Sequence, residues 1–405
     1  MFKKLLALTL ACLMMIPCVV ALAGAETLTC GEYEYTLNDD GSVTITDYHD
    51  RAETLTIPAE LDGHSVSAIG VDAFFGCDSL TSVTIPDSVT SIGDYAFSCC
   101  TALSDISIPD SVISIGDEAF YMCESLASIT LPDSVTSIGI NPFTACIQLS
   151  AIIVSPYNSS LKVIDGVLFD KTSKTLICYP CGLEEPSYIM PEGIQAIGSL
   201  AFYACESLVS ISIPDSVTSI GNNPFACCTQ LTQFTVSPDH PTLETINGVL
   251  FDKSTRTLIC YPCAFTEESY AVPEGIQAIG KSAFGDCTFL INVTLPDGVI
   301  TIDESAFYNC FSLTSITIPD SVASIGNYAF FNCNSLSDIS IPESITSIGD
   351  QAFWGCSSLT CISIPDSVTS IGNQAFYHCP NLTLTVPQNS YAEAYAMENG
   401  IPYTY

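Results

Sequence analysis

Residues 85–107, IPDSVTSIGDYAFSCCTALSDIS, are the stretch from which most of this chain is copied. The step between neighbouring copies is 23 residues wherever nothing is inserted. Related copies begin at Ile108, Leu131, Met190, Ile213, Val272, Leu295, Ile318, Ile341 and Ile364. A fixed step of this length is typical of a solenoid, in which each coil packs against its neighbours. The sequence therefore predicts a fold of stacked 23-residue coils.

Apolar columns run through the copies and place the strands and turns. One isoleucine column runs from Ile69 to Ile371 and a leucine column from Leu80 to Leu382. The phenylalanine column is Phe74, Phe97, Phe120, Phe143, Phe202, Phe225, Phe284, Phe307, Phe330, Phe353 and Phe376. The run at 82–85 alternates polar and apolar residues, which predicts a short strand. Residues 93–100 have the spacing of one helical turn, with Asp94 as its cap.

The strand pattern LxxIxIP followed by SVTSIGxxAFxxC resembles the BspA-like class of leucine-rich repeats, over about residues 57–387. The resemblance implies a curved solenoid of α/β class, mostly short β-strands, with the strands on the concave side. It also implies a secreted or surface-bound protein that binds or adheres to other proteins without catalysis.

The two ends of the chain lie outside the period. Residues 1–25 combine Lys3 and Lys4 with an apolar run and small residues, which predicts a cleaved secretion signal; an uncleaved membrane anchor is the alternative. Residues 26–56 contain two alternating runs around an Asn-Asp-Asp-Gly turn and are predicted to form an N-terminal β-hairpin cap. Residues 57–386 are the predicted solenoid, and 387–405 a C-terminal helical cap. We expect no membrane span after signal cleavage.

Two insertions of 13 residues interrupt the register, near 160–189 and 242–271. Each contains an apolar run, IDGVLF or INGVLF, then a polar turn and TLICYPC, which predicts a projecting hairpin. Six of the seven basic residues outside the signal lie in or beside the hairpins. The candidate binding residues are Lys171, Lys174, Tyr179, Tyr188, Lys253, Arg256, Tyr261 and Tyr270. The alternative is that the lysines only discourage edge-to-edge pairing of strands.

Cysteine occurs 21 times in the chain and is the residue type that most suggests a catalytic or metal-binding role. Eleven cysteines share one column, and we predict that these are buried free thiols filling the core. They are Cys77, Cys100, Cys123, Cys146, Cys205, Cys228, Cys287, Cys310, Cys333, Cys356 and Cys379. The two CYPC motifs, at 178–181 and 260–263, invite a zinc or redox interpretation. A shared zinc is disfavoured because the motifs lie about three coils apart, roughly 15 Å at strand spacing.

The charge of the chain limits its partners. Loss of Lys3 and Lys4 with the signal leaves seven basic against 44 acidic side chains, a formal charge of −37. This excess argues against nucleic acid, whose phosphates would be repelled. An aspartate or glutamate follows the strand proline in most coils, as at Asp87, and is good turn chemistry. The alternative is that this acidic ridge collects Ca²⁺ loosely.

These features predict a secreted or cell-surface, non-catalytic binding or adhesion protein. We predict no catalytic residue, no metal site and no cofactor, because neither a phosphate loop nor a HExxH motif is present. The expected partner is a protein or cell-surface ligand. The alternatives are a purely structural surface spacer and a thiol oxidoreductase that uses the CYPC motifs.

Overall fold

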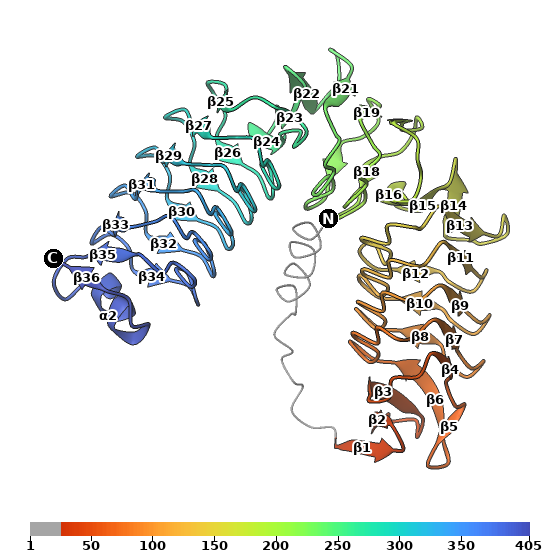
Figure 1. Cartoon of the computed structure of the whole chain (residues 1–405). Helices are drawn as coiled ribbons and strands as arrows, with labels where there is room; N and C mark the ends of the chain where they lie inside the picture. The colour runs from red at the N-terminus through yellow and green to blue at the C-terminus, as the bar shows by residue number, and fades with distance from the viewer. Residues whose placement is uncertain (1–25) are drawn as a thin grey trace. The chain divides into compact units, whose positions relative to one another are not determined.

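A computed structural model describes residues 26–405 of the chain (Figure 1). The expected secretion signal at 1–25 lies outside these residues. The described chain divides into two compact units: residues 26–172 with 177–183, and residues 173–176 with 184–405.

The first unit consists of short strands. They are β1 (Thr27–Cys30), β2 (Tyr33–Leu37), β3 (Val43–Tyr48), β4 (Thr54–Thr56), β5 (Glu60–Leu61), β6 (His64–Ile69), β7 (Ser82–Thr84), β8 (Ser91–Ile92), β9 (Asp105–Ser107), β10 (Ser114–Ile115), β11 (Ser128–Leu131), β12 (Ser137–Ile138), β13 (Ala151–Val154), β14 (Leu161–Ile164) and β15 (Val167–Asp170). The next strand, β16 (Thr175–Cys178), contains residues of both units.

The second unit continues the same pattern and adds a helix. Its strands are β17 (Ser187–Ile189), β18 (Ala196–Ile197), β19 (Ser210–Ile213), β20 (Ser219–Ile220), β21 (Gln233–Val236), β22 (Leu243–Ile246), β23 (Val249–Asp252), β24 (Thr257–Cys260), β25 (Ser269–Ala271), β26 (Ala278–Ile279), β27 (Asn292–Thr294), β28 (Thr301–Ile302), β29 (Ser315–Thr317), β30 (Ser324–Ile325), β31 (Asp338–Ser340), β32 (Ser347–Ile348), β33 (Cys361–Ser363), β34 (Ser370–Ile371), β35 (Thr383–Thr385) and β36 (Tyr403–Thr404). The helix is α2 (Tyr391–Glu398).

A typical coil contributes two strands, each to a different parallel ladder. In the first unit β7 pairs in parallel with β9, and β8 with β10, so that Val83 lies opposite Ile106 and Ile92 opposite Ile115. Figure 1 shows the strands of successive coils side by side in both units. In the second unit one ladder runs β24-β26-β28-β30-β32-β34 and another β25-β27-β29-β31. The chain is therefore a β-solenoid with coils of about 23 residues, as predicted.

The core lies between the ladders and is filled by the predicted columns. Every phenylalanine of the column is buried. Within a unit the rings stack coil on coil, as Phe97 on Phe120 at 5.5 Å and 2° and Phe307 on Phe330 at 5.2 Å and 2°. Parallel aromatic stacks at this separation are favourable beyond the apolar area that they bury. The repeat of one large ring thus fixes the register between coils.

The cysteine column forms a second line of contacts between coils. Nine of its eleven thiols are buried and the two outermost, Cys77 and Cys379, are partly buried; all eleven are thiols rather than halves of disulfides. The Cys123 thiol donates to the Phe97 carbonyl at 3.2 Å, and Cys310 donates to Phe284 at 3.1 Å. The prediction of buried thiols that fill the core is confirmed, and most of these thiols also donate to a carbonyl of the preceding coil.

The predicted helical turn at 93–100 is wrong. The segment consists of turns in which Tyr95 and Cys99 have φ of 54° and 60°. Left-handed residues interrupt a right-handed helix, and here they turn backbone N–H groups toward the next coil. The Phe97 N–H, for example, donates to Ala119 O at 2.8 Å. Asp94 does not cap a helix, because its Oδ1 accepts the Asp117 N–H at 2.7 Å.

The ends of the chain carry elements of their own. Strands β2 and β3 pair antiparallel, and β3 then pairs in parallel with β6, which begins the first ladder. The predicted C-terminal helix is present as α2, with Ser390 as N-cap accepting the Glu393 N–H at 3.1 Å. Their role as caps stays a prediction. In the described part of the chain, no helix has the length and apolar character needed to cross a membrane.

Candidate functional site

The basic side chains of the second insertion lie on the turn between β23 and β24. Lys253 and Arg256 are both exposed there. Asp252 fixes the turn, because its Oδ1 accepts the backbone N–H groups of Ser254 at 2.7 Å and Thr255 at 3.0 Å. Asp side chains stabilise turns in this way. The two cations are therefore displayed on a defined tip rather than on a loose loop.

The corresponding turn of the first insertion carries Lys171 and Lys174. Lys174 is exposed, whereas Lys171 is half-buried and its Nζ donates to the Asn158 carbonyl. Lys171 belongs to the first unit and Lys174 to the second. Both basic residues of the second insertion, in contrast, lie within a single unit. We therefore assign the candidate site to the second insertion.

The prediction that tyrosines join this exposed surface is wrong for Tyr179, Tyr188 and Tyr261, which are 2%, 8% and 2% exposed. Tyr270 is half-buried. Tyr261 packs on Phe284 at 5.3 Å and edge-on against Tyr270 at 4.8 Å. Burial raises the pKa of Tyr270 to about 12. The three buried rings belong to the core, and Tyr270 is a partly exposed ring that packs against it.

The reason lies in the 23-residue period itself. Tyr261 stands 23 residues before Phe284 and takes a place in the phenylalanine stack. Tyr270 stands 23 residues before Val293, and the two are partners in the β25-β27 ladder. Strand β24 likewise continues the solenoid by pairing in parallel with β26, while it also pairs antiparallel with β23. The half of the insertion that begins with TLICYPC is thus part of a coil, and β22-β23 is the added hairpin.

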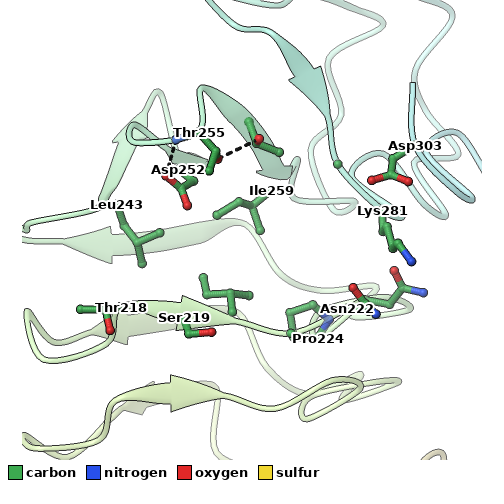
Figure 2. A pocket seen from close by; sticks show the side chains of 15 residues that line it. Thr218, Ser219, Asn222, Pro224, Leu243, Asp252, Thr255, Ile259, Lys281 and Asp303 are labelled. Carbon is green, nitrogen blue, oxygen red and sulfur yellow. Dashed lines mark hydrogen bonds between the residues drawn. The ribbon is translucent and has the colours of Figure 1, made fainter. Parts of the chain in front are cut away.

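A pocket of about 310 Å³ opens beside this hairpin, within the second unit (Figure 2). Its lining comes from β20 and the turn after it, from β22 and the β23-β24 segment, and from Lys281 and Asp303 of the following coils. In Figure 2 the pocket lies between the strand carrying Thr218 and Ser219 and the segments carrying Leu243 and Ile259. It is a place where the insertion has interrupted the stacking of coils.

The charges at the pocket are partly neutralised. Lys281 Nζ lies 3.0 Å from Glu304 Oε2, with about a third or more of both side chains exposed. Asp252 and Asp303 line the pocket as well. An exposed ion pair of this kind contributes at most about 1 kcal/mol. The pocket is therefore polar at its rim without carrying a strong net positive charge.

A second aromatic column was missed by the sequence reasoning. Tyr308 stacks on Phe331 at 4.9 Å, Phe331 on Trp354 at 4.5 Å, and Tyr377 lies 6.5 Å from Trp354. These residues directly follow column phenylalanines at 23-residue spacing, which is the signal that could have revealed them. Phe331 is buried and only Tyr377 is largely exposed. Because the rings cover one another's faces, the column mainly joins consecutive coils.

The CYPC cysteines are placed poorly for redox chemistry. Cys178, Cys260 and Cys263 are buried and Cys181 is partly buried, and all four are thiols rather than halves of disulfides. Burial raises the pKa of the Cys178 and Cys260 thiols well above the usual value, and that of Cys263 to about 12. A thiol must ionise to act as a nucleophile or metal ligand. Their environment therefore disfavours the oxidoreductase and zinc interpretations.

Acidic side chains gather with a histidine on the β2-β3 hairpin. Glu34, Asp47 and His49 place one possible ligand atom each within 4.8 Å of one another. His49 Nε2 lies 2.9 Å from Glu34 Oε1, and the hydrogen bond to Glu34 raises the pKa of His49. Glu34 and Asp47 face each other across the strands, so a protonated imidazole relieves their repulsion. The loose binding of Ca²⁺ by the aspartates that follow the strand prolines stays a prediction.

Comparisons with known proteins identify the family of the repeats and several similar structures. The sequence matches the BspA type leucine rich repeat region in six copies, over residues 48–177, 181–267 and 259–383. The crystal structure of a leucine-rich cell surface protein from Faecalibacterium prausnitzii is similar, with 32% sequence identity, a TM-score of 0.52 and coverage of 92% of this chain and 97% of that chain. The chain is also similar to the pneumococcal vaccine antigen PcpA, with 18% identity, coverage of 93% and 98%, and a TM-score of 0.48. A leucine-rich repeat protein from Eubacterium ventriosum is 23% identical, with coverage of 83% and 96% and a TM-score of 0.46. None of the curated proteins matches this sequence.

Proposed function

The chain belongs to the BspA-type leucine-rich repeat family, and from this premise we propose that it is a secreted or cell-surface adhesion protein that binds another protein through its second insertion. The family is a non-catalytic scaffold, and the similar protein from Faecalibacterium prausnitzii is described as a cell surface protein. Both support a binding role at the cell surface. The proposed contact residues are Lys253 and Arg256, together with the pocket beside them.

The observation that carries the proposal is the display of two exposed cations on one fixed turn of a chain with formal charge −35. Electrostatic complementarity at an interface selects the partner and accelerates its association. A local positive tip on an acidic chain attracts an acidic patch of a partner, while the rest of the chain repels it. The partner class is therefore a surface protein with a small acidic patch.

A structural spacer is the second candidate, and it is favoured by the outward strand positions. Ser82 and Thr84 on β7 and Ser315 and Thr317 on β29 are small and polar. Protein interfaces usually centre on aromatic or arginine anchors, and none of these four residues is of either kind. A spacer would need no contact at the hairpin tip.

Single charge reversals separate the two candidates. Residues 26–405 carrying Lys253→Glu or Arg256→Glu are compared with the wild type and with Arg51→Glu, an exposed residue of the first unit that undergoes the same change of charge. Retention is measured on immobilised host-cell and bacterial surface proteins at low and high salt. Adhesion through the tip predicts a several-fold loss for both tip variants and almost none for Arg51→Glu. If the wild type is retained no better than the tip variants, the adhesion proposal is wrong and the structural spacer is the remaining candidate.

A further inference from the structure

Strand β20 has an outer edge with which no strand of residues 26–405 pairs. It ends its sheet, and among these residues its partner is β18. On the inner edge, the Thr218 N–H donates to Gln195 O at 2.9 Å and the Gly221 N–H donates to Ile197 O at 2.8 Å. In an uninterrupted ladder the next coil repeats both bonds, as where the Gly326 N–H donates to Ile302 O at 2.9 Å. Within residues 184–405, no backbone N–H does this for Thr218 O or Ile220 O.

The side chain of β20 shows the same interruption. Ile220 is half-buried, whereas Ile302 and Ile325 at the same position of complete coils are 0% and 2% exposed. The turn after β20 holds a further unsatisfied group, because Asn223 Oδ1 is buried and accepts no hydrogen bond from the described residues. Backbone and side chain both lack the neighbour that the period would supply.

The space left by that neighbour is the pocket of Figure 2. Thr218, Ser219, Ile220 and Asn223 line one side, while Leu243 approaches from the added hairpin and Ile259 from β24. Its volume of about 310 Å³ lies at the lower end of the range for ligand sites, about 300 to 1,000 Å³. The lining offers apolar contact for one small side chain and, along β20, free main-chain groups.

We infer that the outer edge of β20 binds an extended peptide segment of a partner protein, which adds to the sheet as a parallel strand. Exposed strand edges recruit extended peptides in this way, with the main chain giving affinity and the alternate side chains giving specificity. The peptide residue that enters the pocket is β-branched and apolar, because it must pack on Ile220, Leu243 and Ile259. This inference rests on the proposed protein-binding function and specifies how one partner segment is held.

The charged side chains at the pocket further restrict which peptides can bind there. Asp252, Asp303 and Lys281 line the pocket, and Lys281 already contacts Glu304. An acidic segment is repelled here, so the segment that binds β20 is neutral and flanked by small polar residues. The acidic patch proposed for Lys253 and Arg256 would lie elsewhere on the same partner, opposite the turn.

A peptide copied from the chain itself is the direct probe. Residues 367–373, SVTSIGN, are identical to residues 216–222 and have the pattern of the missing rung. If the peptide repeats the register of β20 on β18, its glycine N–H donates to Ile220 O, while its isoleucine N–H points away from β20. Replacing the glycine by N-methylglycine removes a bond, whereas N-methylation of the isoleucine removes none.

The experiment measures binding of the fluorescein-labelled peptide to residues 26–405 by fluorescence anisotropy. We expect saturable binding, a loss of about tenfold with N-methylglycine, and little change with N-methylisoleucine. Thr255→Trp, at an exposed position lining the pocket, should abolish binding, and Ser254→Trp on the same turn but outside the lining is the matched control. Binding that is absent, or equally sensitive to both N-methyl groups and indifferent to Thr255→Trp, overturns the inference.

Two further outcomes are distinguishable. Concentration-dependent dimerisation of the wild type that Thr255→Trp abolishes would assign the edge to a second copy of the chain and overturn the partner-peptide inference. Peptide binding that fails while retention on surface proteins still depends on Lys253 and Arg256 removes only the β20 site. Peptide binding without any such retention removes the adhesion proposal and leaves the β20 site in place.

Discussion

His240 accepts the backbone N–H of Leu243 at its Nδ1 over 3.0 Å, while its Nε2 lies 3.1 Å from the carbonyl of Pro214. Asn158, 82 residues earlier, makes the same pair of contacts: its Oδ1 accepts the Leu161 N–H at 2.7 Å and its Nδ2 donates to Pro132 O at 3.0 Å. Both side chains are buried. A ring and an amide thus perform one task, fastening each insertion to the preceding coil.

The contacts of His240 require a neutral imidazole that donates from Nε2 and accepts at Nδ1. Burial lowers the pKa of His240 below its ordinary value of 6.5. The neutral form stabilises the fold above about pH 6.5, and that stability is lost as the pH falls through the folded-state pKa, by up to about 1.4 kcal/mol per pH unit. His240→Asn should therefore lose less stability than the wild type between pH 7.5 and 5.5, in urea unfolding. His64→Asn is the control, and a parallel decline of wild type and His240→Asn would contradict the assignment.

Glu118 should destabilise the first unit at neutral and alkaline pH. Glu118 as a residue is 4% exposed; its Oε1 accepts a hydrogen bond from the Tyr95 hydroxyl at 2.8 Å, and its Oε2 has no partner among the described residues. Burial raises its pKa from 4.5 to about 7. The protonated acid is thus favoured on folding, and stability is lost as the pH rises from about 4.5 through 7. Glu118→Gln should stabilise the protein by about 1 to 3 kcal/mol at pH 8 and change little at pH 4.5.

The control for Glu118→Gln is Glu60→Gln, at an exposed position on β5 of the same unit. Thermal or urea unfolding at the two pH values measures both variants. A Glu118→Gln variant that is no more stable than the wild type at pH 8 would show that the carboxylate finds solvent or a cation in solution.

The solenoid could be predicted from the sequence because its physics is periodic. The 23-residue spacing alone indicates that Phe97, Phe120 and the other members of their column share a position in the coil. In the structure their rings stack on one another. Helix α2 was equally accessible, since Ser390 and Gly400 mark its ends. Local pattern and global fold agree at these positions, which is the condition under which sequence patterns are informative.

The errors arose where one pattern admits two structures. Asp94, followed by an alanine and a phenylalanine, fits a helical turn, but left-handed Tyr95 directs the backbone toward the next coil instead. The position of Tyr261 in an insertion favours a surface location, whereas its 23-residue distance from Phe284 indicates a core position, and the structure buries it. The open edge of β20 could not be predicted from residue type, because Ile220 is an isoleucine like the other members of its column.

Thiol reactivity should divide the cysteines by burial. Cys361 is exposed on β33, whereas Cys310 and Cys333 are fully buried and burial raises their thiol pKa values far above the ordinary value. Because the thiolate is the reactive form, iodoacetamide at pH 8 should label Cys361 within minutes and the buried column only when the coils open. Peptide mass spectrometry after timed labelling measures each site. Labelling of Cys310 as fast as Cys361 would mean that the coils separate readily in the native state.

Ile220 and Ile302 offer a test of the interrupted ladder through stability. Ile302 is fully buried between coils, and Ile302→Ala should cost about 2 to 5 kcal/mol because a cavity remains. Ile220 faces the pocket and is half-buried, so that Ile220→Ala should cost markedly less, about 1 kcal/mol, in urea unfolding of residues 26–405. Both substitutions remove the same atoms from the same column of the same unit, and their difference therefore reports what covers each side chain. Equal losses would mean that the edge of β20 is already closed in the free protein, leaving no room for an added strand.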